Sequence, residues 1–308
     1  MNKLIRFLTD KSMRTLYFDS KGLYRGLDDE TYLKKIFEAR MGYPLDLDNP
    51  KTFNEKIQWL KLYDRRPEYT TMVDKYEVKK YVGSLIGEDY IIPTLGVWDR
   101  VEDIDFDSLP NQFVLKCTHD SGGISICRDK KTFDIEKAKE RLDKFMKRDF
   151  YMLWREWPYK NVKHRIIAEK YMEDSSGELR DYKIFTFNGV AKALFIATDR
   201  TNTTSETKFD FYDMDFKHLD FTNGHPNANI KIEKPETFEK MKSLAEKLSD
   251  NIPQLRVDFY EVNGKAYFGE LTFYHWSGLV PFNPPEWDRT FGDWIKLPDK
   301  FGGGVHTD

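Results

Sequence analysis

Apolar side chains recur at helical spacing along the first part of the chain. Residues 29–41 carry them three and four positions apart, which predicts a short amphipathic helix. Thr52 followed by Glu55 is a capping-box pattern and predicts that a second helix begins there. A third helix is expected over residues 73–85, and a short strand over residues 90–92 that ends at a proline.

From residue 113 onward the pattern changes to short apolar runs separated by turn residues. Asn188-Gly189 and Asn263-Gly264 each lie between two such runs, which indicates hairpins and antiparallel sheets. The polar stretch 198–229 is expected to be a long loop with a minor strand at 209–212. The remaining expected elements are strands at 113–117, 124–127, 165–171, 182–187, 190–197, 255–262 and 266–271, and helices at 134–148 and 235–250.

Composition narrows the class of protein. At 308 residues the chain can form one large domain or two to three lobes. Its 49 basic residues nearly balance its 52 acidic ones, which argues against a general nucleic-acid binder. No apolar run is long enough for a transmembrane segment, and two cysteines, Cys117 and Cys127, fit a reducing compartment. We therefore expect a cytoplasmic protein with buried, unreactive thiols.

The first candidate for chemistry is the turn that follows Lys116. Thr118, His119, Asp120, Ser121, Gly122 and Gly123 join two strands, and backbone amides in such a turn can fold over phosphates while the lysine contacts their oxygens. A glycine-containing hairpin with a nearby lysine is equally sufficient as plain structure. The pattern is not a Walker A loop, because no Gly-Lys-Ser/Thr follows and the loop opens no helix.

The second candidate is the carboxylate pair Asp258 and Glu270, one on each strand of the last hairpin. A shared divalent cation would stabilise both charges if they face the same side, whereas two solvent-facing carboxylates need no partner. A two-residue Asn263-Gly264 turn would point them to opposite faces. The metal hypothesis therefore requires a three-residue, bulged loop, which pairs Asp258 with Glu270 and places Thr272 on the same face.

Two further features carry alternatives. Arg256 lies two residues before Asp258 and either neutralises a phosphate or forms a surface salt bridge. Asp213 and Asp215 form an Asp-x-Asp triplet, which is typical of metal-dependent glycosyltransferases that use nucleotide sugars. That reading gives an alternative function, although the triplet is short and lies in the long polar stretch.

The order of these motifs resembles the ATP-grasp superfamily, and more narrowly the TupA-like amidoligases of bacterial teichuronopeptide and surface-polysaccharide biosynthesis. The resemblance covers most of the chain. It rests on residues 49–63, 73–76, 113–123, 181–183, 256–260 and 269–273.

The resemblance implies an α+β class and an ATP-grasp fold, in which two lobes with antiparallel sheets clamp the nucleotide. The implied regions are a mostly helical region at 1–98, a small lobe with the glycine-rich loop at 99–172, a large lobe with the metal site at 173–300 and a mobile tail at 301–308.

The resemblance also assigns roles to individual residues. The implied nucleotide contacts are Lys75, Lys116, the loop from Thr118 to Gly123, Asp181, and a hinge of Glu169, Lys170 and Tyr171 against adenine and ribose. Lys183 and Arg256 are expected near the transferred phosphate, with His275 as a candidate base. Asp258 and Glu270 are the implied Mg²⁺ ligands, joined by Thr272 where the superfamily commonly has asparagine.

The implied reaction activates a carboxylate with ATP to an acylphosphate, which an amine then displaces to give an amide. Such chemistry depends on positioning and charge neutralisation rather than on a nucleophile of the protein. The expected substrates are a carboxylate such as a uronic acid of a glycan or its precursor, and an amine such as an amino acid or amino sugar.

Overall fold

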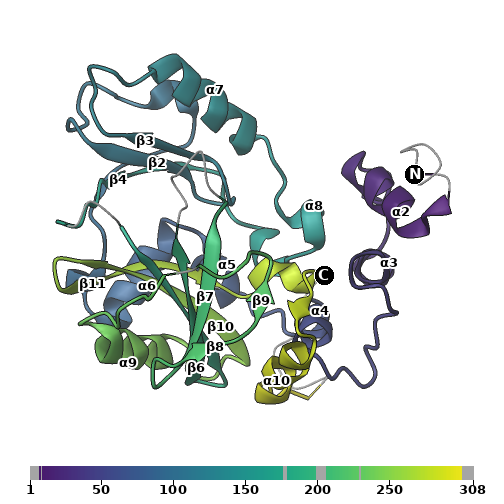
Figure 1. Cartoon of the computed structure of the whole chain (residues 1–308). Helices are drawn as coiled ribbons and strands as arrows, with labels where there is room; N and C mark the ends of the chain where they lie inside the picture. Colours follow the sequence, from purple (N-terminus) through teal and green to yellow (C-terminus); the bar gives the residue numbers. More distant parts are fainter. Residues whose placement is uncertain (1–6, 8, 176–178, 199–205, 229, 300–308) are drawn as a thin grey trace.

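Two antiparallel sheets lie one above the other, with helices at the N-terminal end of the chain packed beside the lower sheet (Figure 1). The computed structural model describes residues 7, 9–175, 179–198, 206–228 and 230–299. The predicted mobile tail at 301–308 lies outside these residues. The α+β class is confirmed.

The N-terminal helices follow the sequence pattern closely. They are α2 (Lys11–Ser20), α3 (Asp29–Met41), α4 (Phe53–Tyr63), α5 (Glu68–Val73) and α6 (Glu77–Ile86). At the start of α4 both hydrogen bonds of the predicted Thr52–Glu55 capping box are formed. The helix predicted over residues 73–85 forms as α6 but begins later than expected, because Asp74 has extended backbone and its carboxylate accepts from the backbone amide of Tyr76, which ends α5 before α6 begins.

The upper sheet has the strand order β1-β4-β2-β3, and together with α7 we call it the small lobe; its first strand lies within the region 1–98 that was predicted to be mostly helical. Its elements are β1 (Thr94–Trp98), β2 (Phe113–Cys117), β3 (Ile124–Cys127), α7 (Ile135–Met146) and β4 (Ile166–Lys170). The strand expected at 90–92 is wrong: a 3₁₀ turn occupies Glu88–Tyr90, and the strand follows Pro93 to pair with β4. Both cysteines are buried and free, as expected.

The lower sheet has the order β11-β10-β5-β6-β7-β8, and together with the elements after it in the chain we call it the large lobe. The strand expected to be minor is β7, a full member of this sheet with a largely buried surface. The elements of the lobe are β5 (Asp181–Phe187), β6 (Val190–Thr198), β7 (Lys208–Asp213), β8 (His218–Leu219), β9 (Thr222–Asn223), α9 (Phe238–Leu248), β10 (Gln254–Val262), β11 (Lys265–Thr272), β12 (Phe282–Asn283) and α10 (Glu286–Trp294).

The β10–β11 hairpin pairs Asp258 with Glu270, as the metal hypothesis requires, but not through the turn that was predicted. Val262 pairs with Lys265, and Asn263 and Gly264 both have positive φ, so the turn has two residues and the predicted three-residue loop is wrong. The register shifts further along, where Gly269 is the extra residue and Asp258 pairs with Glu270. A Cβ on Gly269 would lie 3.0 Å from the Asp258 carbonyl oxygen, so glycine suits this bulge.

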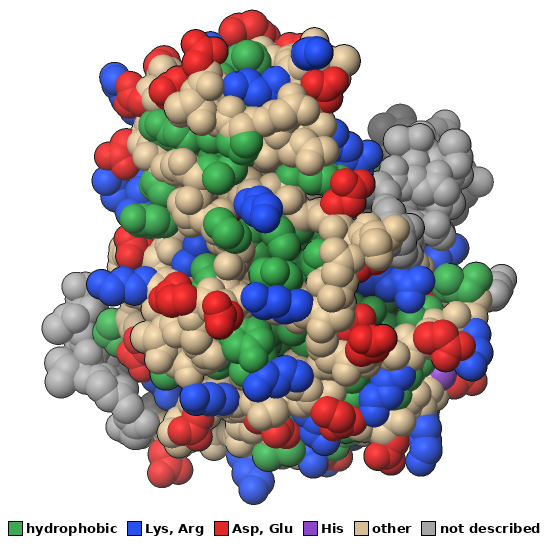
Figure 2. Space-filling view, turned by 90° about the vertical axis from the view of Figure 1, so that its left-hand side faces the viewer, with side chains coloured by type: hydrophobic (Ala, Val, Ile, Leu, Met, Phe, Trp, Pro, Cys, Tyr) green, Lys and Arg blue, Asp and Glu red, His purple; other side chains and the backbone are tan. Residues whose placement is uncertain are grey.

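Buried side chains form two separate clusters. The larger one joins the lower sheet, α9 and the helices α3 to α6, and the smaller one lies between the upper sheet and α7. The segment with α8 (Tyr151–Trp154) and a 3₁₀ turn (Trp157–Tyr159) leaves the small lobe and packs against the larger cluster. Basic and acidic side chains are interspersed over the face in Figure 2. Within the described residues, no helix has the length and apolar character required to cross a membrane.

Candidate nucleotide and metal site

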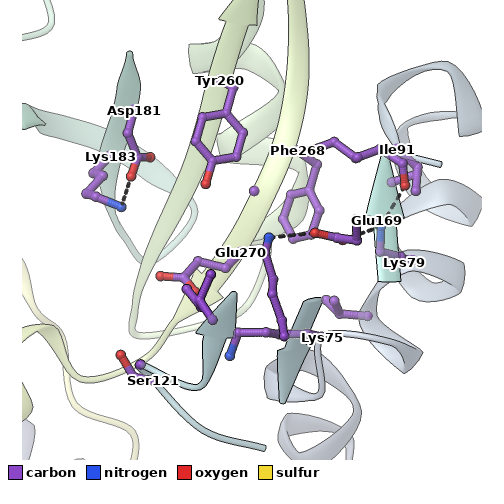
Figure 3. Close-up of a pocket in the computed structure, with 16 residues that line it drawn as sticks. Lys75, Lys79, Ile91, Ser121, Glu169, Asp181, Lys183, Tyr260, Phe268 and Glu270 are labelled. Atoms are coloured by element: carbon purple, nitrogen blue, oxygen red, sulfur yellow. Dashed lines mark hydrogen bonds and ion pairs between the residues drawn. The ribbon is translucent and has the colours of Figure 1, made fainter. Parts of the chain in front are cut away.

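A polar cleft lies between the two sheets (Figure 3). Side chains from α6, the upper sheet, the glycine-rich loop and the lower sheet line it, and they include four lysines and three carboxylates. The charged lining residues are Lys75, Lys79, Lys116, Lys183, Glu169, Asp181 and Glu270. Six of these seven were predicted from the sequence, and the cleft brings them together.

On the small-lobe side, Glu169 of β4 lies between two lysines. Its carboxylate oxygens are 2.5 Å from the ammonium nitrogens of Lys79 and Lys116. Burial raises the pKa of Glu169, but the two ammonium groups outweigh it and lower this pKa to about 2. Burial lowers the pKa of Lys79 overall, whereas the charge of Glu169 leaves the pKa of Lys116 raised. Two cations and one anion leave this wall with an excess positive charge that suits a phosphate chain.

The glycine-rich loop contributes its tip to the cleft and buries its beginning. Ser121 and Gly122 line the cleft, and the Lys75 ammonium donates to the Asp120 carbonyl oxygen at 2.5 Å. Gly122 has a φ of 119°, which a side chain would strain. The Lys75 backbone amide also donates to the Thr118 carbonyl at 3.1 Å. The loop is therefore attached to the end of α5 as well as to its own strands.

The predicted loop residues Thr118, His119 and Asp120 have buried side chains that do not line the cleft. His119 stacks on His164 with ring centroids 3.5 Å apart, and burial, with the neighbouring imidazole, lowers its pKa to about 4. Asp120 lies 3.4 Å from the Arg148 guanidinium. These buried side chains stabilise the conformation of the loop.

On the large-lobe side, Asp258 is held by two cations. Arg256 Nε and Nη2 lie 2.7 and 2.8 Å from its two oxygens, and the Lys183 ammonium contacts the same carboxylate. Lys183 also lies 2.7 Å from Asp181. Burial raises the pKa of Asp258, but Arg256 and Lys183 reverse this and lower it. Asp258 is thus an ionised carboxylate beneath the cleft rather than in its lining.

Of the three residues proposed for Mg²⁺, only Glu270 is among the residues that line the cleft, although all three offer the oxygen atoms that this ion prefers. Glu270 lines the cleft opposite Asp258 in the strand register, its side chain is 43% exposed, and Arg256 Nη2 approaches it only to 3.4 Å. The Thr272 hydroxyl accepts from the same guanidinium nitrogen at 3.0 Å. In the described part of the chain, no group of three or more His, Cys, Asp or Glu side chains is arranged so that it could hold a metal ion. Mg²⁺ commonly uses one or two carboxylates and completes its shell with water and phosphate oxygens, so Glu270 can begin such a shell. Asp258 and Thr272, which are bonded to Arg256, stay predictions as ligands.

His275 is buried behind Arg256 instead of lining the cleft. Its Nδ1 lies 2.8 Å from Arg256 Nη1 and its Nε2 lies 3.0 Å from Asn223 Oδ1. Because the guanidinium only donates, Nδ1 accepts and Nε2 carries the proton. Burial and the charge of Arg256 lower the pKa of His275 well below its usual value. In this arrangement the neutral imidazole orients Arg256, and its role as a base stays a prediction.

Other predicted site residues lie away from the cleft lining. Lys170 is exposed at the end of β4, and neither it nor Tyr171 is among the lining residues. In the Asp-x-Asp triplet, Asp213 accepts from the backbone amides of Asp215 and Lys217 at 2.9 and 2.8 Å, which closes the turn between β7 and β8. This turn accounts for the Asp213 carboxylate without a metal ion.

Several residues that line the cleft were not predicted from the sequence, among them Lys79, Phe268 and Ile91. Lys79 lies four residues after Lys75, and this spacing would have placed both on one side of a helix. Phe268 and Ile91 give the cleft an apolar wall and form a bridge between segments distant in the sequence (Figure 3). Only the tertiary fold brings these two together.

Comparison with known proteins places this geometry in a family. The family model described as TupA-like ATPgrasp matches residues 55–296. The chain therefore belongs to the TupA-like ATP-grasp family, and its fold is an ATP-grasp fold. None of the curated proteins matches it.

The chain is distantly similar to solved ligase structures. D-alanine–D-alanine ligase from Bacillus anthracis complexed with ATP is 17% identical with a TM-score of 0.40, covering 66% of this chain and 55% of that one. L-amino acid ligase from Bacillus licheniformis is 12% identical with a TM-score of 0.45, covering 82% and 57%. D-alanine–D-alanine ligase from Helicobacter pylori is 16% identical with a TM-score of 0.42, covering 81% and 70%. The chain thus spans little more than half the length of the first two ligases.

Proposed function

We propose that the chain is an ATP-dependent carboxylate–amine ligase that binds its nucleotide in the cleft between the two sheets. The observation that carries this proposal is the meeting of Lys75, Lys79, Lys116 and Lys183 with Glu270 in one cleft, from both sides of the ATP-grasp fold. Phosphoryl transfer requires lysines that neutralise the phosphate chain and a carboxylate that faces it.

The residues divide the work between binding and transfer. Lys75, Lys116 and the amides at Ser121 and Gly122 bind the phosphates, and Lys183 neutralises the phosphoryl group during transfer. Asp258, Glu270 and Thr272 would hold Mg²⁺, which when bound supplies positive charge beside the phosphates. The hinge of Glu169, Lys170 and Tyr171 against adenine and ribose stays a prediction of the family resemblance.

The reaction proceeds in two displacements. A carboxylate oxygen of the substrate attacks the γ-phosphorus, the bond to the β-phosphate oxygen breaks, and ADP leaves with an acylphosphate remaining. An amine nitrogen then attacks the acyl carbon, phosphate leaves, and the nitrogen loses a proton to give the amide. Arg256, fixed by Asp258 and His275, would stabilise the negative charge of the transferred group from beneath the cleft.

The substrates are proposed from the resemblance to TupA-like amidoligases. The carboxylate is a uronic acid in a bacterial surface polysaccharide or its precursor, and the amine is an amino acid or an amino sugar. The alternative, a glycosyltransferase that uses Asp213 and Asp215, is disfavoured because Asp213 closes a turn within the sheet.

The test compares nucleotides and then products. Mg-ATP should raise the melting temperature and UDP-sugars should not, and ADP and phosphate should appear only when a carboxylate and an amine are both supplied. Stabilisation by a UDP-sugar without stabilisation by ATP would refute the ligase and favour the glycosyltransferase.

A further inference from the structure

One face of helix α4 is polar and buried, although such a face normally meets solvent. Asn54, Gln58 and Lys61 recur four and three residues apart, and at most 1% of each is exposed. Gln58 donates to the carbonyl oxygens of Ser277 and Gly278 at 3.0 and 2.8 Å, and Asn54 donates to a carbonyl further along the same loop. This face of α4 is therefore bound to the loop that follows β11.

That loop has backbone geometry that needs external support. Trp276, Ser277 and Gly278 have φ values of 48°, 56° and 61°, three left-handed residues in succession. Two of them carry side chains, for which this region is unfavourable, and such geometry persists only when the surroundings hold it. His275, which contacts Arg256, is the residue immediately before this run.

Lys61 supplies the strongest of these contacts. Its ammonium donates to the Ser277 carbonyl at 2.8 Å, the Ser277 hydroxyl at 2.7 Å and the Trp154 carbonyl at 3.1 Å. Glu156 is the charged partner of Lys61, and the Ser277 hydroxyl bonds to both side chains, although burial lowers the pKa of Lys61 to about 7 and raises the pKa of Glu156. Burying a lysine is costly, and here the cost is met by contacts that converge on a single strained loop.

We propose that Lys61 is a positioning residue for Arg256: it holds the loop that sets His275, and His275 holds the guanidinium against Asp258 and Glu270. The inference rests on the proposed ligase function for its catalytic consequence and on the contacts alone for its structural one. Because Trp154 and Glu156 belong to the segment between α7 and β4, the same ammonium also holds that segment against the larger cluster.

The test replaces Lys61 with Met and uses Lys56→Met as a matched control. Lys56 lies on the same helix but donates to the carbonyls of Gly292 and Ile295, both at 2.8 Å, away from the site. The first readout is the ¹⁵N spectrum of the imidazoles at neutral pH, with the His275 signals assigned by their loss in a His275→Gln variant. The second readout compares two constants, the kcat of the ligase reaction and the Kd for ATP.

In the wild type and in Lys56→Met, His275 should show a single neutral tautomer with the proton on Nε2. In Lys61→Met this signature should be lost or exchange-broadened, and kcat should fall about 100-fold, as displacement of a catalytic group by about 1 Å can produce. The Kd for ATP should change less than about threefold, because Lys61 is not among the residues that line the cleft.

A folded Lys61→Met variant with an unchanged His275 spectrum would overturn the proposal. If that variant does not fold, two others replace it. The double variant Lys61→Met with Glu156→Gln removes both charges of the pair, and Ser277→Ala removes one acceptor of the Lys61 ammonium and no charge. An unchanged His275 spectrum in whichever of these folds would equally overturn the proposal. If the wild type releases no ADP with any carboxylate and amine, the ligase proposal fails, and the spectra still decide the role of Lys61.

Discussion

The carboxylate of Glu169 holds two buried lysines, so replacing it with glutamine tests the electrostatics of the small-lobe wall. The pKa of Glu169 is about 2 against an ordinary 4.5, and its side chain is 8% exposed. At about 1.4 kcal/mol for each pKa unit, the ionised form contributes about 3 kcal/mol of folding free energy at neutral pH. Loss of one partner of a buried ion pair gives a similar figure, about 3 to 5 kcal/mol.

The sign of the pH dependence follows from the lowered pKa. The contribution of Glu169 is fully present above pH 4.5, where the unfolded side chain is also ionised, and it is lost as the pH falls toward 2. At pH 3.5 about 2 kcal/mol should remain. The difference between wild type and Glu169→Gln should therefore shrink in acid.

Urea unfolding at pH 7 and pH 3.5 measures both quantities. Glu77→Gln is the matched control, because Glu77 also pairs with a cation, Arg165 at 2.8 Å, but its side chain is 45% exposed. An exposed pair contributes at most about 1 kcal/mol. The reasoning is refuted if Glu169→Gln is no less stable than this control at pH 7, or if its deficit does not decrease in acid.

Three further outcomes are expected. Glu270→Gln should abolish ADP release while changing the melting temperature little, since the side chain is 43% exposed; retained turnover would remove Glu270 from the metal site. Gly269→Ala should cost about 1 to 3 kcal/mol of stability in urea unfolding and lower kcat, because its Cβ would lie 3.0 Å from the carbonyl of Asp258, and wild-type stability would contradict the bulge. His119 has a pKa of about 4, so the free energy of unfolding should fall by up to about 3 kcal/mol as the pH drops from 6.5 to 4, because the unfolded imidazole binds a proton that the folded one excludes. His119→Phe should flatten this pH dependence in urea unfolding, and an unchanged dependence would show that His119 does not cause it.

Local chemistry explains which parts of the fold could be predicted from the sequence. The capping box at Thr52 and the Asn263-Gly264 turn depend on neighbouring residues alone, and the helix start and the tight turn both form. The bulge at Gly269 was placed in the turn instead, because an isolated glycine within a strand gives only a weak signal. The break at Asp74 was missed because its side chain competes with the helix for backbone amides.

Some residues of the candidate site could likewise be predicted from the sequence, and others could not. Lysines beside a glycine-rich loop and paired carboxylates on a hairpin are visible in sequence, and the cleft brings them together. The contact of Arg256 with His275 joins two elements and depends on a loop shaped by Lys61. A lysine on an amphipathic helix is normally solvent-exposed, so its burial could not be read from spacing.

The two buried clusters share no residue, which determines how the cleft can open. The segment from Tyr151 to Val162 stays packed on the larger cluster, whereas α7 before it and β4 after it belong to the small lobe. A tilt of the upper sheet about the ends of this segment would therefore leave both buried clusters intact. Ion pairs of Lys79 with Glu169 and of Arg165 with Asp74 oppose such a tilt, together with the hydrogen bonds from Lys75 to the loop. Added salt should weaken the ionic share of this resistance, and a bound polyphosphate should favour closure by joining cations from the two lobes.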